Sequence, residues 1–310
     1  MTLHGEYLMS TLQPRKRINY LNNADMLCEL HKSKMSYCST HDERHFDYDL
    51  IVKDISQINV RFLQSGIETR QKRIVNNVVR QIQKNLNCTP KQALAHMERK
   101  MDRVDVPEIT VYDVVVRVMT DEHIPYEDEN DESNTKKIKT NFKPFKHVVL
   151  HEDGELEEVV WSHWKGTIRD GAFSQNHGKI TNELANMFVK LSDKIGTKAC
   201  FRGYSFLDEM KSTARFQLIK NALLFDESRE TKQLNPFAYY TTVVSHAFMA
   251  ILNDEKKRRN LRDDLLEANG FDPSITRLVE IEENMIRAFH DKNATPPDND
   301  DIDGILTYND

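Results

Sequence analysis

The chain has 310 residues, of which 39% are apolar and 30% charged, with a net charge of −6 and a mean hydropathy of −0.64. This composition is typical of a polar globular protein and argues against a fibrous or integral membrane protein. No stretch approaches the roughly 18 consecutive apolar residues of a membrane span, and no export signal begins the chain. We therefore expect a cytoplasmic protein with no membrane partner.

The negative charge is concentrated in the C-terminal part of the chain. Residues 263–310 contain thirteen Asp or Glu and only three Lys or Arg. Because the whole chain carries −6, the residues before Asp263 carry +4. Phosphate contacts need clustered Lys and Arg. The overall charge therefore does not exclude a nucleic-acid partner.

The first 165 residues predict one short helix followed by a mixed α+β segment. Asn22 or Asn23 can cap the helix, and Thr89-Pro90 is typical of a helix start. Helical spacing of apolar residues runs from Leu63 to Leu86, and valine-rich strands are expected at 111–119, 147–150 and 157–161, with an acidic loop at 127–132. We predict an N-terminal helix within residues 1–40 and a separate small module at 41–165.

The remainder of the chain predicts a helical bundle. One helix begins near Thr181, and a second follows a break at residues 200–204. A third begins at Asn235-Pro236, a cap followed by proline, and is expected to end at the cations of 256–259, which suit the negative end of a helix. After Gly270 one more amphipathic helix precedes a flexible acidic linker at 293–301. In the second helix we expect a common buried side formed by Met210, Phe216, Ile219, Leu223 and Leu224.

Residue types that support catalysis or metal binding occur without a recognisable motif. Cys28, Cys38, Cys88 and Cys200 lack the paired spacing of zinc sites and are interpreted as thiols that pack. His41 and His45 stand at helical spacing but without a further ligand motif. The group His147, His151, Glu152 and Asp153 resembles a nuclease cluster but equally suits strand ends and turns. We predict no enzyme activity, no metal and no cofactor.

A set of short motifs in one order carries a family resemblance. They are Phe201-Arg202-Gly203-Tyr204, Glu209-Met210, Leu218-Ile219-Lys220, Phe225-Asp226-Glu227 and Asn235-Pro236-Phe237-Ala238-Tyr239, followed by Lys256 to Arg259. This stretch, together with Asn19-Tyr20-Leu21-Asn22-Asn23 near the N-terminus, resembles the late-transcription sigma factors of T-even-type bacteriophages. It is also similar to region 2 of the sigma-70 family.

The resemblance implies a fold and a division of the chain. The expected fold is mainly α, a sigma-70 region 2-like helical bundle with an inserted small α+β module and a flexible C-terminal tail. Residues 1–40 would pack on the core, 41–165 would be the insertion, and 166–262 would be the region 2-like core. Residues 263–310 would hold the acidic helix, the linker and a sliding-clamp-binding peptide.

The resemblance also implies a surface that reads and opens the −10 element of promoter DNA. One aromatic residue of this surface captures a flipped base, and the register favours Tyr239 over Tyr240, although both tyrosines can instead be buried packing residues. The chain has threonine and valine where housekeeping sigma factors place a tryptophan pair, which suggests weaker assistance in melting. The other residues expected at the DNA are Thr241, Thr242, Ser245, His246, Lys256, Lys257, Arg258 and Arg259.

Two further contacts follow from the same resemblance. The second helix matches the face that docks on the β′ subunit of host RNA polymerase, although exposed polar residues on a helix are usually only solvated. The end of the chain has the character of a peptide that binds the phage sliding clamp, and a functionless terminus is the alternative. The predicted β′-binding residues are Glu209, Ser212, Thr213 and Gln217, and the predicted clamp-binding residues are Ile302, Ile305, Leu306 and Tyr308.

The sequence therefore predicts a phage late sigma factor that acts in the cytoplasm of the infected host. Its expected partners are host core RNA polymerase, late-promoter DNA and the phage sliding clamp, and a phage late co-activator is a further candidate. The alternative is a polymerase-binding adaptor that never reads DNA. The two hypotheses separate at the tyrosines, because an adaptor would not depend on them for promoter opening.

Overall fold

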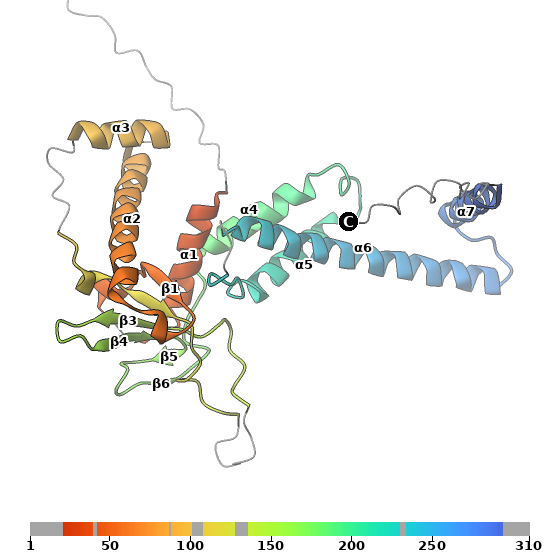
Figure 1. Ribbon diagram of the computed structural model, residues 1–310. Helices are drawn as coiled ribbons and strands as arrows, with labels where there is room; N and C mark the ends of the chain where they lie inside the picture. The colour runs from red at the N-terminus through yellow and green to blue at the C-terminus, as the bar shows by residue number, and fades with distance from the viewer. Residues whose placement is uncertain are drawn as a thin grey trace, which may run out of the picture. The chain divides into compact units, whose positions relative to one another are not determined.

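The computed structural model describes residues 21–39, 42–86, 88–100, 108–127, 136–229 and 234–293, without the side chains of residues 84, 90, 98–100 and 288–293. This part of the chain is mainly α-helical, as predicted (Figure 1). The helices are α1 (Asn23–Met35), α2 (Val60–Leu86), α3 (Pro90–Lys100), α4 (Asn182–Gly196), α5 (Leu207–Lys220), α6 (Pro236–Ala268) and α7 (Ile275–Asn293). The strands are β1 (Leu50–Val52), β2 (Val116–Val118), β3 (Lys146–Leu150), β4 (Leu156–Trp161), β5 (Trp164–Lys165) and β6 (Ala172–Phe173).

The chain divides into two compact units, Met1–Ser245 and His246–Asp310, whose boundary lies within α6. The predicted boundaries after residues 40, 165 and 262 do not coincide with this division. In particular, the segment predicted as a separate module, 41–165, belongs to the same unit as α1, α4 and α5. The reason is a shared interior, described below, that joins the sheet to both α1 and the loop after α5.

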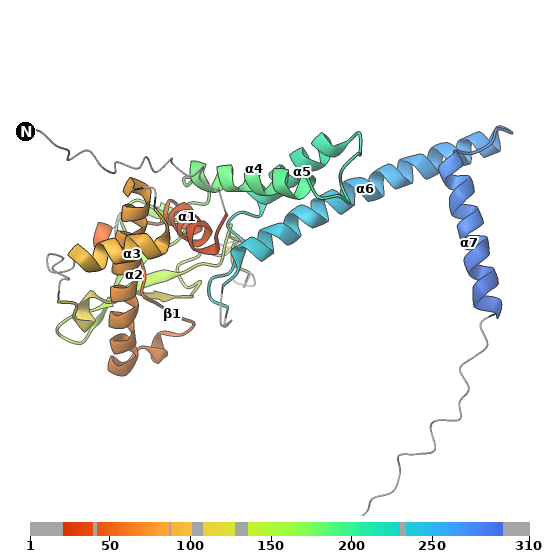
Figure 2. The ribbon, with the colours of Figure 1, turned by 90° about the horizontal axis from the view of Figure 1, so that it is seen from above.

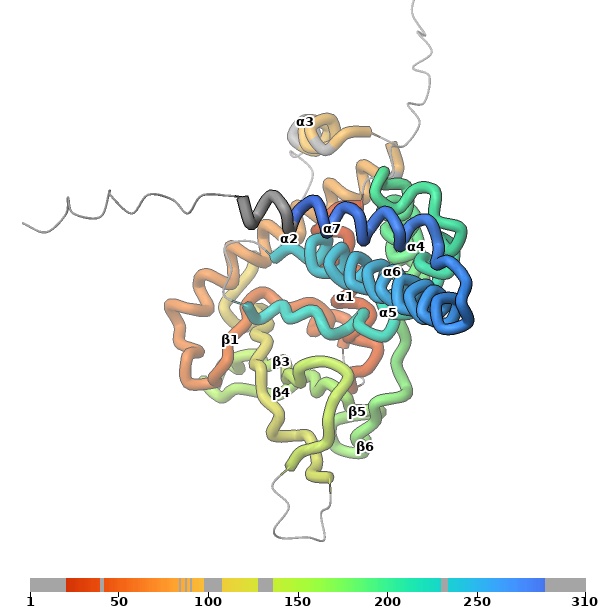
Figure 3. The backbone as a smooth tube through the Cα atoms, turned by 90° about the vertical axis from the view of Figure 1, so that its right-hand side faces the viewer, coloured from red at the N-terminus to blue at the C-terminus, as the bar shows by residue number. Residues whose placement is uncertain are grey.

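A small sheet packs against the first half of α2. Its strand order is β1-β2-β3-β4, with β1 parallel to β2 and the other pairs antiparallel. The β5–β6 hairpin lies beside this sheet, and α3 crosses the far end of α2 (Figures 1 and 3). A Cβ on Gly66 of α2 would collide with Leu50 and Val114, so the glycine permits close packing. The core of this contact contains Val52, Leu63, Val114, Val116, Val118 and Val148.

Side chains alternate along a strand, so Arg117 and His147 point away from the valine core. Arg117 is almost fully buried, and its guanidinium lies between the rings of Tyr48 and Phe145, 3.9 Å from each centroid. Its Nη1 donates to Glu227 Oε2 at 2.6 Å. This buried arginine therefore connects the sheet to the loop after α5.

Helix α1 completes the same buried cluster. Lys34 Nζ lies 3.3 Å from Glu227 Oε1 and donates to the Phe225 carbonyl at 2.8 Å. Arg117 also donates to the His147 ring at 3.1 Å, and its Nη2 lies 3.0 Å from His31 Nδ1. We call Lys34, Arg117 and Glu227, with their partners His31 and His147, the Arg117 cluster. Through this cluster the sheet and the helical part of unit 1 share one buried interior.

The helical part of unit 1 is built from α1, α4, α5 and the start of α6. Several local predictions are confirmed: Asn22 caps α1, α4 begins next to Thr181, and α6 begins at Pro236. Asn23 has a second role, because its Oδ1 accepts from the backbone N–H of Phe237 at 3.1 Å. The buried side chains of this part include Met26, Leu30, Leu184, Phe188, Leu191, Met210, Ala214, Leu218, Tyr240 and Val244.

The described part of unit 2 consists of the rest of α6 and of α7. The prediction that the helix ends at the cations of 256–259 is wrong, because α6 continues to Ala268. The turn that follows Ala268 contains Gly270, which has a φ of 78°, a conformation that glycine adopts without strain. The prediction of a helix after Gly270 is confirmed by α7. Figure 2 shows α7 leaving the end of α6 at a large angle.

None of the helices in the described part of the chain combines the length and apolar character needed to cross a membrane. The four cysteines are free thiols, as expected, and Cys38 is buried. Burial raises the pKa of Cys38 to about 12, which makes this thiol unreactive. Cys200, in contrast, is exposed, so its interpretation as a packing residue is wrong.

Candidate functional site

The start of α6 carries the residues predicted to read DNA. Asn235 Oδ1 accepts from the Ala238 N–H at 2.9 Å, which caps the helix and fixes the direction of its first turn. Tyr239 and Tyr240 follow in that turn and therefore point to different sides of the helix. The structure separates their roles.

Tyr240 is a core residue, which removes it from the predicted DNA surface. Its side chain has no exposed area, and its ring centroid lies 4.8 Å from that of Phe188. Its hydroxyl donates to the Ala222 carbonyl at the end of α5. Burial also raises its pKa far above the usual range. A ring held on all sides in this way has no free face for a base.

Tyr239 is half-buried and lies at the edge of the same aromatic group. Its ring packs edge-on against Phe225 at 5.6 Å and Tyr240 at 5.1 Å between centroids. Partial burial raises the pKa of its hydroxyl, so the phenol stays neutral. Two neighbouring rings therefore restrict the orientation of Tyr239 while leaving part of it accessible, as a stacking platform requires.

The polar residues that follow Tyr239 differ in exposure. Thr242 is exposed and its hydroxyl donates to the Ala238 carbonyl at 3.1 Å. Ser245 is half-buried and donates to the Thr241 carbonyl at 2.9 Å. The Thr241 hydroxyl is buried, with no hydrogen-bond partner among the described residues. Thr242 is thus the best placed of these hydroxyls to meet a ligand in solution, as an acceptor.

The remaining predicted DNA contacts, His246 and the cations of 256–259, belong to unit 2. His246 is exposed. Arg258 pairs with Glu255 at 2.6 Å, Lys257 lies 3.8 Å from Asp254, and Arg259 pairs with Glu280 of α7 at 3.0 Å. Since these cations lie within α6 and three of them have acidic partners, they make a weaker phosphate-binding group than the sequence suggested.

The predicted polymerase-binding residues lie on α5. Glu209 and Ser212 are exposed, and Thr213 and Gln217 are half-buried. The prediction of a common buried side that includes Met210 and Leu223 is wrong for the three other residues assigned to it. Phe216, Ile219 and Leu224 are 64%, 53% and 48% exposed. The buried side is instead Met210, Ala214 and Leu218, at spacings of four residues.

The exposed side of α5 carries a further surface, which was not predicted from the sequence. Glu209, Ser212, Phe216 and Ile219 recur at spacings of three or four residues, which places them on one face of α5. We call these four residues the α5 stripe. Two large, exposed apolar side chains in its C-terminal half, Phe216 and Ile219, give the stripe the composition of a protein-binding surface rather than of a solvated face. The sequence did contain a signal for this surface, because on a helical wheel Phe216 and Ile219 lie away from the row of Met210, Ala214 and Leu218.

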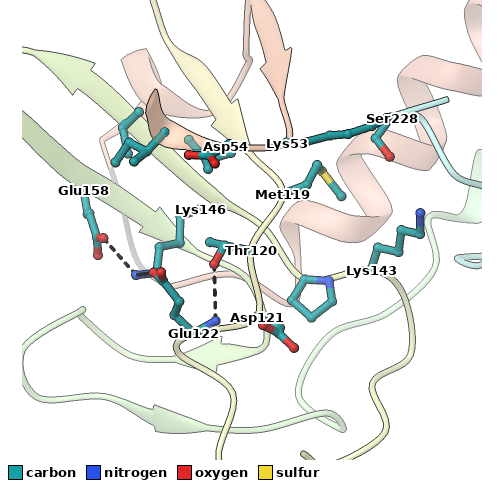
Figure 4. Close-up of a pocket in the computed structure, with 14 residues that line it drawn as sticks. Lys53, Asp54, Met119, Thr120, Asp121, Glu122, Lys143, Lys146, Glu158 and Ser228 are labelled. Atoms are coloured by element: carbon teal, nitrogen blue, oxygen red, sulfur yellow. Dashed lines mark hydrogen bonds and ion pairs between the residues drawn. The ribbon is translucent and has the colours of Figure 1, made fainter. Parts of the chain in front are cut away.

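A cavity of about 590 Å³ opens where β1 and β2 end and β3 begins (Figure 4). Its charged groups largely satisfy one another. Lys146 lies 2.8 Å from Glu158 and 3.3 Å from Glu122, and Lys143 pairs with Asp226 at 2.6 Å. None of the predicted site residues lines it. Most of the charged groups around this pocket are therefore paired with one another rather than available to a ligand.

The alternative enzyme cluster is not assembled. His147 is buried against Arg117, whereas His151 is exposed and lies 2.8 Å from Glu157. Within the described residues, no group of three or more His, Cys, Asp or Glu side chains is arranged to hold a metal ion. His41, the acidic loop between 128 and 132, and the clamp-binding residues Ile302, Ile305, Leu306 and Tyr308 lie outside the described residues.

Comparisons with known proteins give no match: no family model, no curated protein and no solved structure is similar to this chain.

Proposed function

We propose that this protein is a late-transcription sigma factor of the T-even bacteriophage type, which lends promoter recognition to the core RNA polymerase of its host. The observation that carries the proposal is the position of Tyr239. The motif Asn235-Pro236-Phe237-Ala238-Tyr239 begins a capped helix and leaves Tyr239, like Phe237, partly accessible, with the ring of Tyr239 packed against Phe225 and the buried Tyr240.

The proposed opening step needs no nucleotide hydrolysis. Unstacking a base costs a few kcal/mol, and stacking on an aromatic side chain returns about 1 to 3 kcal/mol per base. Tyr239 would receive the base that leaves the −10 duplex, and its neighbours Phe225 and Tyr240 would hold the ring in place. Thr242 and Ser245 would accept hydrogen bonds from the displaced strand. An AT-rich element, which unstacks easily, suits a reader without a tryptophan pair.

The α5 stripe would bind the polymerase. An interface residue contributes most when a large apolar side chain fills a pocket and polar neighbours exclude water around it. Phe216 and Ile219 would be such anchors, with Glu209 and Ser212 at the rim. The predicted C-terminal peptide would hold the phage sliding clamp, and the infected host's cytoplasm would be the site of action.

Promoter opening is tested by permanganate reactivity of thymines on a late promoter, with host core polymerase and the full chain. Reactivity at the −10 element should appear only when the protein is present. Tyr239→Ala should reduce it about 5- to 100-fold, the equivalent of one lost stack, whereas Tyr239→Phe should retain it. Tyr112→Ala, which removes a tyrosine that is 45% exposed elsewhere in unit 1, is the matched control.

Polymerase binding is tested separately, by the affinity of the labelled chain for core enzyme. Phe216→Ser should weaken binding about tenfold or more, the loss typical of an interface anchor. Val189→Ser, on α4 and 41% exposed, should not. Binding to core without any thymine reactivity would refute the sigma factor proposal in favour of an adaptor. Unchanged binding by Phe216→Ser would refute the role of the α5 stripe.

A further inference from the structure

Helix α7 is held to α6 by its polar side. Arg259 of α6 donates to Glu280 at 3.0 Å, and Arg277 reaches Asp264 and, at 3.3 Å, Glu267. At the turn between the helices, Ser274 donates to Asp263 at 2.7 Å. We call these contacts the α6–α7 seam. An amphipathic helix normally turns its apolar face toward its neighbour, and α7 does the opposite with respect to α6.

The apolar face of α7 is consequently exposed. Ile275, Leu278 and Met285 are 79%, 48% and 67% exposed, and Val279 and Ile286 beside them are 46% and 51% exposed. These side chains lie on the side of the helix away from Arg277 and Glu280, as the spacing of 3.6 residues per turn requires. Figure 2 shows that the second half of α7 projects beyond α6, so α6 does not cover it.

The order of the exposed residues is that of a coiled-coil seam. Ile275, Leu278, Glu282 and Met285 follow one another at spacings of three, four and three residues, the a/d pattern of a heptad repeat. Glu282 occupies an a position between apolar d residues and is itself exposed. A carboxylate buried there without a cation would cost several kcal/mol. Any helix that covers this seam must therefore supply the cation.

A second copy of α7 paired in the same register does not supply it. The seam of α7 contains no Lys or Arg at positions 275, 278, 282 or 285, so two copies would bury two carboxylates without partners. The charge around the α7 seam also favours a cationic partner, because residues 261–287 hold seven Asp or Glu and three Lys or Arg. The same charge disfavours an anionic membrane surface.

From these observations we propose that α7 is a docking helix for another protein, whose own helix carries an apolar heptad seam with one Lys or Arg opposite Glu282. This proposal does not depend on the proposed sigma activity. The apolar residues provide the affinity, and the charge pair selects the partner, as single polar residues at a positions do in coiled coils.

The probe for this proposal is a synthetic helical peptide of about three heptads, with Ile and Leu at its seam and Lys at the central a position. Its control has Glu at that position. The full chain should bind the Lys peptide about tenfold or more tightly than the Glu peptide, because Lys pairs with Glu282 whereas Glu places two like charges opposite each other. Glu282→Lys should reverse this preference, and Met285→Ser should abolish binding of the Lys peptide.

The control variant is Leu261→Ser, which removes an apolar residue of α6 that is 62% exposed and lies on the side away from the seam. It should leave peptide binding unchanged, and circular dichroism should show the same helicity in all variants. The proposal fails if Glu282→Lys does not reverse the preference, or if Met285→Ser binds normally. It also fails if sedimentation shows that the full chain self-associates, or if the chain binds anionic phospholipid vesicles, and Met285→Ser removes that association or binding.

Discussion

The Arg117 cluster and the α6–α7 seam are each held together by arginine–carboxylate pairs. The two regions differ in how exposed these pairs are to water. In the Arg117 cluster the side chains of Arg117 and Glu227 are 2% and 4% exposed. In the α6–α7 seam, Arg259 and Glu280 are 29% and 42% exposed. The contacts are of similar length, so distance does not distinguish them. Burial decides the energy, because a buried charge that loses its partner is left without solvent.

The largest effect is expected from Glu227→Gln. This change leaves the charges of Arg117 and Lys34 buried without an anion, and should lower the free energy of unfolding of unit 1 by about 3 to 5 kcal/mol. Both tryptophans of the chain, Trp161 and Trp164, lie in unit 1, so urea titration followed by tryptophan fluorescence measures it.

The control for this prediction is Glu68→Gln, which removes the exposed partner of Lys72 within the same unit. Exposed pairs contribute about 0 to 1 kcal/mol. A loss of less than about 1 kcal/mol in Glu227→Gln would mean that water enters the Arg117 cluster and that the contrast between the two regions does not hold.

Acid should affect the buried region in two steps. His163 is fully buried, which lowers its pKa to about 3, against an ordinary value of 6.5. The unfolded chain therefore takes up this proton first, and the stability that neutral His163 provides is lost as the pH falls from about 6.5 to about 3. Burial alone would raise the pKa of Glu227, but Lys34 and Arg117 hold it at about 2, so its contribution is lost from about pH 4.5 to about 2.

The histidine step can be isolated. His163 has a φ of 56°, a conformation that Asn tolerates, so His163→Asn should fold. Between pH 6 and pH 4 it should reduce the slope of unfolding free energy against pH by about one proton, or about 1.4 kcal/mol per pH unit. His151→Asn is the control, since the contact with Glu157 raises the pKa of that exposed residue. An unchanged slope in His163→Asn would contradict the prediction.

Interactions between residues close in the sequence were predictable, whereas those between distant residues were not. Asn22 and Asn235 were recognisable as helix caps because a cap bonds within its own first turn. The pairing of Arg117 with Glu227 spans 110 residues and leaves no local pattern. The end of α6 was misplaced because cations suit a helix end but do not terminate a helix.

The candidate site shows the same limit. The sequence located both tyrosines in the first turn of α6, but only tertiary packing distinguishes the buried Tyr240 from Tyr239. On α5 the spacing of Met210, Ala214 and Leu218 defined one buried row, and it could have placed Phe216 on the opposite side. The resemblance to a family gave the order of the motifs, and the packing determined which of their residues are accessible.

The smallest effect is expected in the α6–α7 seam. A double-mutant cycle of Arg259→Gln and Glu280→Gln should give a coupling of about 0.2 to 1 kcal/mol, since the pair is partly solvated. Because unit 2 contains no tryptophan, the measurement is amide hydrogen exchange of residues 275–287. At about 1 M salt, where the screening length is about 3 Å, this coupling should vanish. The coupling between Arg117 and Glu227 should persist under the same conditions, because ions cannot enter a buried cluster. Equal salt sensitivity of the two couplings would show that burial does not separate these regions.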